Sequence, residues 1–485
     1  MNDKTTLYYI NNGSYGLVLQ DNTNSIYKVT KVTYIAESTN EYLIERNNII
    51  EVIMLNTFNN ICNNIITIKN TFFYKLDELN KIYDIHKYRY RRSENYYIVN
   101  IFNKYSNISN ICTKENLKET ILKFKSVIKD ILLGISVLHQ NGFLHGDIKL
   151  ENVLLNTDTA IIIDFGGAKL LYNNTYYKSC TITSRCPEDL HYEYYNLSIY
   201  NSSIKSDIWS LGILFTQILL GYNPITKIYN NLKKKYNRYK DIEFSLLNYY
   251  SFSKSIDVQS LFNEIFNKEI YLYNENDYNE IKRIITIIEK MLIIKPKDRI
   301  DSIEKIYEEI FEEKYNFNYI KKYTYEYEFI KNNKFYKFRN KLYSNILSNC
   351  KKINNINIVP FIFDLLDRIF NLYLEHKVDI YTLTELQVES INISIIFIAL
   401  IILYNISPNF TEYVDILEIK YINFLILQET IIDLIKDINY DVYRPFYFFN
   451  IDNNQQNKLE NICNNILINN IIGVTPTYYN KELNN

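Results

Sequence analysis

Glycine, proline, cysteine and histidine are all scarce in this chain of 485 residues, which holds 10 Gly, 7 Pro, 6 Cys and 5 His. No two cysteines form a CxxC pair, so a zinc site is not expected. The first residues, MNDKTTLYYI, lack the basic segment followed by an apolar one that marks a secretory leader. Scattered cysteines without such a leader fit a reducing compartment, and we expect an intracellular, cytoplasmic protein.

Neither sign of charge is in excess. The 54 Lys and Arg residues balance 55 Asp and Glu residues, which leaves a formal net charge of −1. The overall charge therefore offers no electrostatic case for a nucleic-acid or membrane partner, and we expect neither. Tyr is abundant, with 47 residues, as are Ile, Asn and Lys. These residues are favoured by A+T-rich codons, which suggests the genome of a large DNA virus or a protist. For a virus, the host cell or the virion would be the location.

Two short motifs carry most of the chemical information. The motif HGDIKLENVL places Asp147, Lys149 and Asn152 at fixed offsets, and the motif IIDFGGAK that follows contains Asp164. Strand-like apolar runs lie beside both motifs. Either motif alone could arise by chance, but the two in this order are specific. Together they resemble the catalytic loop and the metal-binding loop of a eukaryotic-type serine/threonine protein kinase.

The resemblance implies a role for each of these residues. Asp147 would accept or orient the substrate hydroxyl. Lys149, two residues later as in serine/threonine kinases, would reach the γ-phosphate of ATP. Asn152 and Asp164 would hold Mg²⁺, so ATP and Mg²⁺ are the expected cofactors. Phosphoryl transfer needs little covalent help from a protein, because it depends on positioning the hydroxyl and offsetting charge on the phosphates.

The catalytic motif itself departs from the family pattern at one position. Gly146 stands where the kinase motif usually has an Arg between its His and its Asp. That Arg normally receives an activation-loop phosphate through charge-assisted hydrogen bonds. Gly146 has no donor side chain, so activation through this contact is in doubt. Catalysis is not in doubt, because the Arg does no chemistry.

Ahead of these motifs, the sequence NNGSYGLV lies between two strand-like segments and predicts a hairpin. Glycines let a backbone approach phosphate groups, and a hairpin of this kind covers ATP in kinases. By resemblance, Gly13, Gly16 and Val18 would contact the nucleotide. The first glycine of the usual pattern is replaced by Asn11.

The next expected strand, SIYKVTK, contains two candidate lysines for the α- and β-phosphates. Lys28, in the context IYKV, matches kinases best, and Lys31 is the alternative. Residues 40–58 have apolar positions near a 3.6-residue period and predict a helix. By resemblance, this helix supplies a Glu that pairs with the Lys. Glu51 is the first candidate and Glu45 the second.

Further motifs follow the second loop. The sequence CTITSRCPE resembles the end of a kinase activation segment, where Thr181 would bond the catalytic Asp and Lys. Asp207, in SDIWSLGI, would brace the catalytic loop. Arg299, in KPKDRI, would form a buried structural pair with Glu188.

The expected fold class is α+β. A bilobal protein kinase fold, with a β-rich N-lobe and an α-rich C-lobe, is expected over residues 1–315. Residues 96–102 would form its last N-lobe strand, and residues 117–138 a long helix before the catalytic loop. A charged, Tyr-rich connecting segment is expected over residues 316–340. Residues 341–485 are too many for a kinase tail and predict an all-helical domain.

The C-terminal region contains three informative stretches. Residues 359–374 predict an amphipathic helix. Residues 388–406 are apolar on nearly every face, with polar residues near both ends, which favours the central helix of a bundle over a membrane span. The polar run NNQQN, residues 453–457, predicts a loop.

This order of helices resembles a cyclin box. Cyclins have a helix ending in Asp-Arg, here Asp367 and Arg368, and then a buried central helix entered by Leu-Gln, here Leu386 and Gln387. Independently, Arg185 just before Cys-Pro-Glu resembles the cyclin-dependent kinases. The resemblance implies a cyclin-like domain that acts as an intramolecular regulator.

Two functions are consistent with these features. The first is a serine/threonine protein kinase that transfers the γ-phosphate of ATP to Ser or Thr hydroxyls of a protein substrate, regulated by the cyclin-like domain. The second is a pseudokinase or scaffold that binds nucleotide or a protein partner, motivated by the departures at Gly146 and Asn11. The presence of Asp147, Asn152 and Asp164 favours the first.

Overall fold

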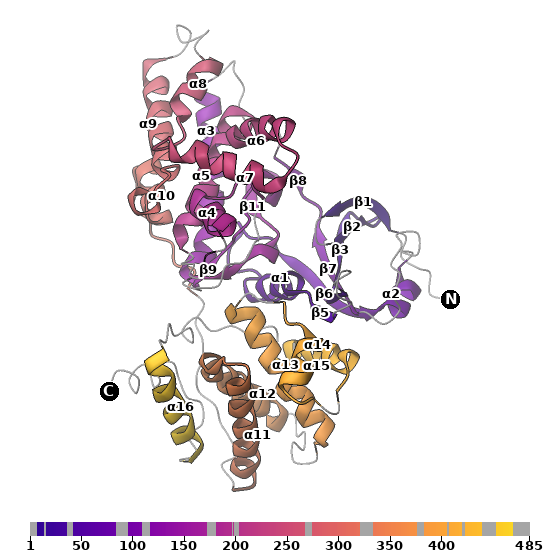
Figure 1. The fold of residues 1–485 in the computed structure, drawn as a ribbon. Coiled ribbons are helices and arrows are strands. Elements are labelled where there is room, and N and C mark those ends of the chain that lie inside the picture. The colour runs from indigo at the N-terminus through magenta and orange to yellow at the C-terminus, as the bar shows by residue number, and fades with distance from the viewer. Residues whose placement is uncertain are drawn as a thin grey trace. The chain divides into compact units, whose positions relative to one another are not determined.

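The computed structural model of the chain forms two compact units (Figure 1). The first comprises Met1–Thr57, Ile68–Asn103 and Lys321–Asn485, and the second comprises Phe58–Thr67 and Lys104–Ile320. Each unit therefore collects segments that are distant in sequence. The structure describes residues 7–13, 16–35, 42–83, 96–108, 117–171, 181–195, 197, 203–266, 274–320, 333–375, 383–404, 407–419, 422–438 and 453–468.

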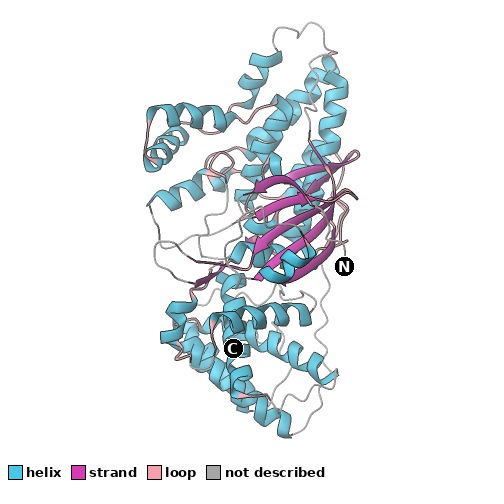
Figure 2. Cartoon of the chain, turned by 90° about the vertical axis from the view of Figure 1, so that its right-hand side faces the viewer, coloured by secondary structure: helices cyan, strands magenta, loops and turns pink. Residues whose placement is uncertain are grey.

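The first unit contains a five-stranded antiparallel sheet (Figure 2). In spatial order its strands are β1 (Tyr8–Gly13), β2 (Gly16–Gln20), β3 (Ser25–Lys31), β7 (Tyr96–Asn103) and β6 (Ile68–Lys75). The predicted hairpin is confirmed as β1 and β2, and the strand predicted at residues 96–102 is confirmed as β7. Residues 14–15, between β1 and β2, lie outside the described residues.

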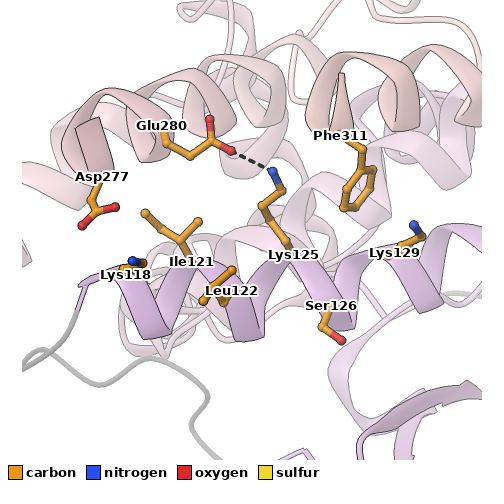
Figure 3. A pocket seen from close by; sticks show the side chains of 9 residues that line it. All are labelled: Lys118, Ile121, Leu122, Lys125, Ser126, Lys129, Asp277, Glu280 and Phe311. Carbon is orange, nitrogen blue, oxygen red and sulfur yellow. Dashed lines mark hydrogen bonds and ion pairs between the residues drawn. The ribbon is translucent and has the colours of Figure 1, made fainter. Parts of the chain in front are cut away.

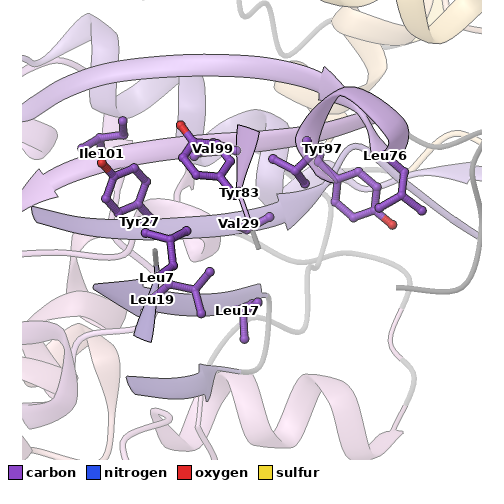
Figure 4. Close-up of a cluster of buried hydrophobic side chains, with 11 residues drawn as sticks. Leu7, Leu17, Leu19, Tyr27, Val29, Leu76, Tyr83, Tyr97, Val99 and Ile101 are labelled. Carbon is purple, nitrogen blue, oxygen red and sulfur yellow. The ribbon is translucent and has the colours of Figure 1, made fainter. Parts of the chain in front are cut away.

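Alternation of side chains separates the two faces of this sheet. The large apolar side chains of β2, β3 and β7 on one face join a buried cluster with α2 (Leu76–Ile82) (Figure 4). The cluster consists of Leu7, Leu17, Leu19, Tyr27, Val29, Leu76, Leu79, Tyr83, Tyr97, Val99 and Ile101. Val18 and Lys28 alternate with these residues along β2 and β3. They therefore lie on the opposite face, away from the cluster.

The helix predicted over residues 40–58 is present but begins later than predicted. It is α1 (Arg46–Thr57), and nearly all its residues are buried. Tyr42–Ile44 instead forms the strand β5, which pairs antiparallel with β4 (Thr33–Ile35). This pairing depends on a partner strand elsewhere in the chain, so local periodicity could not predict it.

The C-terminal helices of the first unit gather around α13 (Glu385–Tyr404), which contacts α11 (Asn333–Lys352), α12 (Val359–Glu375) and α15 (Phe424–Asp437). The prediction of a central, buried helix is confirmed, although α13 begins three residues earlier than predicted and residues 405–406 lie outside the described residues. By length and composition α13 could cross a membrane, but most of its apolar stretch is buried within the protein.

Three details of this region differ from expectation. Asp367 and Arg368 lie in the middle of α12 rather than at its end. The prediction of a loop at residues 453–457 is wrong, because these residues form the first part of α16 (Asn453–Ile468). Buried apolar side chains at a helical spacing later in α16 explain the helix: Leu459, Ile462, Cys463 and Ile466. Finally, α11 runs through residue 340, the predicted boundary of the connecting segment.

A buried ion pair connects α11 and α12. Arg339 Nε donates to Asp367 Oδ1 at 2.8 Å, and Arg339 Nη2 donates to Asp367 Oδ2 at 3.0 Å. The hydroxyl of Tyr343 donates to the same carboxylate. Burying charges is costly unless each charge is paired and hydrogen-bonded. Both carboxylate oxygens of Asp367 are hydrogen-bonded in this pair, which fixes the register between the two helices.

The second unit is mainly helical. Its helices are α3 (Leu117–Gln140), α4 (Pro187–Tyr195), α5 (Ile204–Leu220), α6 (Pro224–Lys235), α7 (Tyr239–Ser251), α8 (Val258–Phe266), α9 (Glu275–Met291) and α10 (Ile303–Phe311). Its short strands are β8 (Ser106–Asn107), β9 (Phe143–Leu144), β10 (Val153–Asn156), β11 (Thr159–Ile162) and β12 (Lys169–Leu170). The helix predicted over residues 117–138 is confirmed as α3.

The chain after α10 folds back along α3, which the sequence did not predict. The backbone N–H of Tyr319 donates to Gln140 Oε1 at 2.7 Å, and Gln140 Nε2 donates to Phe317 O at 3.2 Å. Asn141 Nδ2 also donates to Tyr319 O at 2.9 Å. These contacts attach residues up to Ile320 to the second unit.

A pocket of about 330 Å³ lies on this unit at α3, α9 and the end of α10 (Figure 3). Lys125 Nζ donates across it to Glu280 Oε1 at 2.8 Å. Its lining residues are Lys118, Ile121, Leu122, Lys125, Ser126, Lys129, Asp277, Glu280 and Phe311. No residue singled out by the sequence lines this pocket, so it is not the candidate site.

Candidate active site

Asp147 is the centre of a hydrogen-bonded group in the second unit. It lies between β9 and the short helix η2 (Leu150–Asn152), and only 4% of its surface is exposed. Its Oδ1 accepts from the backbone N–H of Thr181 at 3.1 Å, and its Oδ2 accepts from Lys149 Nζ at 2.5 Å. Lys149 Nζ also donates to Thr181 Oγ1 at 3.1 Å. The structure thus brings together three residues that the sequence singled out.

Asn152 is held against the same aspartate. Its Nδ2 donates to the backbone oxygen of Asp147 at 2.8 Å and to Oδ2 at 3.3 Å. Both contacts use the amide nitrogen. The amide oxygen of Asn152 has no hydrogen-bond partner among the described residues, so it can serve as an oxygen ligand.

Backbone pairing holds Asp164 close to Asn152 in the chain's path. The N–H of Ile163, the residue just before Asp164, donates to Asn152 O at 3.0 Å. Asp164 itself has φ 64° and ψ 75°, a left-handed conformation that is uncommon for residues other than glycine. Backbone strain of this kind is often found at functional sites. The chain then packs closely on the Asp147 loop, since a Cβ on Gly167 would lie 3.2 Å from Asp147 Cβ.

Asn152 and Asp164 suit Mg²⁺ better than a metal that needs a full protein cage. Among the described residues, no group of three or more His, Cys, Asp or Glu side chains could hold a metal ion. Mg²⁺ prefers oxygen ligands and is commonly held by one or two protein groups together with waters and substrate phosphates. The donor set of one amide oxygen and one carboxylate fits that pattern.

Asp207 in α5 fixes the backbone just before Asp147. Its Oδ2 accepts from the N–H of His145 at 2.8 Å and lies 2.9 Å from His139 Nε2, and its Oδ1 accepts from the N–H of Gly146 at 3.0 Å. Burial alone would raise the pKa of Asp207, but the hydrogen bonds with His139 and His145 lower it below its usual value. The carboxylate therefore stays ionised and holds the loop. The sequence did not single out His139, whose only signal is a histidine at the end of a predicted helix.

Gly146 has a conformational reason to be glycine. Its φ is 75°, in the left-handed region that glycine adopts freely and other residues adopt with strain. The hydrogen bond to Asp207 holds it there. Glycine at this position therefore lacks the Arg side chain but lets the turn before Asp147 adopt its left-handed conformation without strain.

In the first unit, the structure pairs Lys28 with Glu51. Lys28 Nζ donates to Glu51 Oε1 at 2.5 Å, and Glu51 is only 3% exposed. Lys31 lies three residues after Lys28 in β3. Because side chains alternate along a strand, Lys31 is on the face of the sheet opposite to Lys28. Glu45 precedes α1, where its N–H donates to Val32 O at 2.8 Å, and burial raises the pKa of its carboxyl. Of the four predicted candidates, only Lys28 and Glu51 meet in this way.

The hairpin residues have structural roles that can be read directly. A Cβ on Gly16 would lie 2.5 Å from Thr30 Cγ2, so the sheet itself requires glycine there. Gly13 is opposite Gly16 in the register of the hairpin, and Val18 is opposite Lys28. Val18 thus lies on the face of the sheet that carries the Lys28 side chain. Contact of these residues with a nucleotide stays a prediction.

Two ion pairs anchor the segment after Thr181. Arg299 Nη1 and Nη2 donate to the two carboxylate oxygens of Glu188 at 2.7 and 3.0 Å, which is the predicted pair. Arg185 Nη1 donates to Glu193 Oε2 in α4. Both arginines are buried, so these pairs fix the end of the segment next to the Asp147 group.

The C-terminal helices of the first unit contact its sheet through α15. Gln428 is fully buried, and its Oε1 accepts from Thr33 Oγ1 at 3.2 Å and from the N–H of Tyr96 at 3.4 Å. Glu429 accepts from Lys75 Nζ at 2.8 Å and from the hydroxyl of Tyr96. The hydrogen bond from Lys75 lowers the pKa of Glu429.

The same helices also contact α1 and the strand before it. Ser407 Oγ accepts from the N–H of Arg46, the first residue of α1, at 3.2 Å. Pro408 O accepts from the N–H of Ile44 at 3.3 Å. Contacts between α13 and α1 extend this interface. The helix that carries Glu51 is thus held on one side by the C-terminal helices.

Comparison with known protein families gives one match that covers most of the chain. Residues 6–315 match the model of the protein kinase domain. This range includes all the residues predicted from the two catalytic motifs, the hairpin and the Lys–Glu pair. It ends before α11, so the match does not extend to the C-terminal helices.

Individual relatives match over shorter stretches. The chain is 35% identical over 25% of its length to "Putative serine/threonine-protein kinase" of Acanthamoeba polyphaga mimivirus, covering 21% of that protein. It is 33% identical over 24% of its length to the cAMP-dependent protein kinase catalytic subunit of Schizosaccharomyces pombe, covering 22% of it. It is also 32% identical over 24% of its length to protein kinase gsk3 of the same yeast, covering 29% of it. The matched part is thus less than a third of each relative.

Proposed function

Because this chain belongs to the protein kinase family, we propose that it is a serine/threonine kinase that transfers the γ-phosphate of ATP to a protein substrate. The observation that carries this proposal is the group formed by Asp147, Lys149 and Thr181. A carboxylate that accepts hydrogen bonds from a Lys two residues later and from a Thr of the activation segment is suited to orient a hydroxyl. The name of the mimivirus relative also supports the serine/threonine class.

Each residue of the group has a chemical role in this proposal. Asp147 orients the substrate hydroxyl and takes its proton as the bond to phosphorus forms. Lys149 offsets negative charge on the transferred phosphoryl group. In the first unit, Lys28 binds phosphates of ATP, and Glu51 keeps its ammonium group in position.

The remaining predicted residues bind the nucleotide and the metal ion. Asn152 and Asp164 would hold Mg²⁺ through their oxygens, and Mg²⁺ when bound would neutralise charge on the phosphates. Gly13, Gly16 and Val18 would lie over ATP.

Phosphate transfer by the purified full-length protein tests this function. With γ-labelled ATP and a generic protein substrate, we expect label on Ser and Thr, no label on Tyr, and loss of transfer when Mg²⁺ is chelated. Phosphoamino-acid analysis of the labelled substrate makes the distinction. Binding of a fluorescent ATP analogue without any transfer would favour the scaffold function instead.

We also propose that the C-terminal helices are a cyclin-like regulator that acts in cis on the kinase part, residues 1–315. Three features support this: the order of helices, the buried central helix α13, and the contacts of these helices with α1 and its neighbouring strands. Because α1 carries Glu51, its position governs the pairing with Lys28. A regulator on the same chain acts at an effective concentration in the mM range.

The contact at Gln428 provides a specific test of this regulation. Replacing Gln428 with Ala removes the buried acceptor that the hydroxyl of Thr33 and the N–H of Tyr96 share, a loss of about 1–2 kcal/mol. If the interface holds α1 in its active position, turnover should fall by about tenfold, since ~1.4 kcal/mol corresponds to a factor of ten. Gln387→Ala is the matched control, because among the described residues Gln387 bonds only to Thr384, at the start of α13. Unchanged turnover of Gln428→Ala would make the C-terminal helices a passive appendage.

A further inference from the structure

Six cations gather in one short stretch of the second unit. They are Lys227, Lys233, Lys234, Lys235, Arg238 and Lys240. All six side chains are exposed, and none forms an ion pair with any described residue. No Asp or Glu occurs between Asp207 and Asp241. In a chain whose net charge is −1, this basic segment (residues 227–240) is a strong local asymmetry.

Local helix electrostatics explain only part of this charge. Three of the lysines lie in the last turn of α6, where cations are favoured by the helix dipole. Arg238 and Lys240 lie instead at the first turn of α7, where the dipole disfavours them. Cations kept at an unfavourable position, with no ion-pair partner among the described residues, point to a negatively charged ligand.

The basic segment begins beside the proposed hydroxyl-binding group. Asn223 caps α6 by accepting from the N–H groups of Ile225 and Thr226, and its Nδ2 donates to Thr183 O at 3.3 Å. Thr183 is two residues after Thr181, which bonds Asp147. At the other end of the segment, α7 packs on α4 through the rings of Tyr194 and Phe244, 5.6 Å apart. The chain before the basic segment thus contacts the end of the activation segment, and the helix at its other end contacts α4, which follows that segment.

We propose that the basic segment binds an acidic stretch of the protein substrate. This inference rests on the proposed kinase function and adds the substrate class. From Asn223 to Lys233 the helix rises about 15 Å. An extended peptide covers that distance in about four to six residues. The preferred substrate therefore carries several Asp or Glu residues about four to six positions from the phosphorylated Ser or Thr.

The triple variant Lys227→Ser, Lys233→Ser and Lys240→Ser tests the proposal in the full-length protein. It removes Lys233, which sets the expected spacing, and leaves Lys234 and Lys235 in the last turn of α6, so the melting temperature should not change. Two peptides with the same acceptor are compared, one with a Glu cluster at the stated distance on either side and one with Ala there. For the acidic peptide we expect a fall in kcat/KM of tenfold or more, through KM. For the neutral peptide we expect no change.

A variant with the same charge change elsewhere on the second unit serves as control. Lys254→Ser, Lys295→Ser and Lys297→Ser also remove three exposed cations, but away from the basic segment. This control should treat both peptides as the wild type does. Raising the salt concentration should weaken the preference of the wild type for the acidic peptide, because exposed charges are screened.

Peptide binding, measured by fluorescence anisotropy, keeps this inference separate from the kinase function. If no phosphate is transferred but the acidic peptide binds and the triple variant loses that binding, the kinase function fails and acidic recognition stands. Equal use and equal binding of the two peptides by the wild type would overturn the inference. A second outcome would also overturn it: the wild type binds a DNA duplex but not the acidic peptide, and the triple variant loses the binding of DNA.

Discussion

Replacing Asp147 with Asn is expected to lower phosphate transfer by roughly 100- to 10,000-fold. The Asn amide has the size and shape of the Asp carboxylate, but it cannot take the proton of the substrate hydroxyl. Nucleotide binding should persist, because the substitution leaves Lys28, Asn152 and Asp164 in place. Single-turnover transfer of labelled phosphate, together with a binding assay for an ATP analogue, separates the two effects.

The surroundings of Asp147 add a second, smaller consequence. The groups around its carboxylate are donors: the N–H of Thr181, Nζ of Lys149 and Nδ2 of Asn152. An amide NH₂ must face one of these donors, which removes at least one hydrogen bond and costs about 1 kcal/mol. A modest drop in melting temperature is therefore expected, without unfolding.

A matched substitution distinguishes catalysis from a general effect of charge. Asp158 is exposed in the turn between β10 and β11 of the same unit, so Asp158→Asn should leave both transfer and stability unchanged. Near wild-type transfer by Asp147→Asn would disprove its proposed role.

Contiguous motifs made the Asp147 group predictable from sequence. Asp147, Lys149 and Asn152 lie within six residues, so one short loop brings them together. Asp207 could be predicted only from its own motif. Its interaction with His139 depends on how α3 and α5 pack, which no local pattern encodes.

Features that depend on strand pairing or on the spacing of a few apolar residues were harder to predict. The sequence left Lys28 and Lys31 as alternatives, because both lie in one strand and only the faces of the folded sheet distinguish them. The predicted start of α1 was wrong because Tyr42–Ile44 pairs with β4. In α16, polar composition concealed a helix whose apolar residues are few but regularly spaced.

From the sequence, Gly146 indicated only that the Arg side chain of the kinase motif is missing. The structure adds that its backbone is left-handed, which requires knowledge of φ and could not come from the motif. Both facts bear on regulation. The turn at Gly146 is unstrained without an Arg side chain, and the C-terminal helices hold α1. Both observations fit an activation that does not need a phosphate bound next to Gly146.

Replacing Lys28 with Met should lower turnover by orders of magnitude, whereas Lys31→Met should have little effect. The Met side chain keeps the length and apolar body of Lys but removes the ammonium group that would bind the phosphates. Lys31 is the matched control, because it undergoes the same substitution in the same strand but points to the opposite face. Initial rates at saturating ATP, and the KM for ATP, are the measurements.

A double substitution tests whether Lys28 and Glu51 act as a unit. Glu51→Gln removes the negative charge that holds Lys28, so it should also lower turnover. Residues that act through each other give non-additive losses. The combined Lys28→Met and Glu51→Gln variant should then be no slower than Lys28→Met alone. If Lys31→Met were the inactive variant instead, the functional lysine would be on the other face of β3. The pairing of Lys28 with Glu51 would then serve stability and not phosphate transfer.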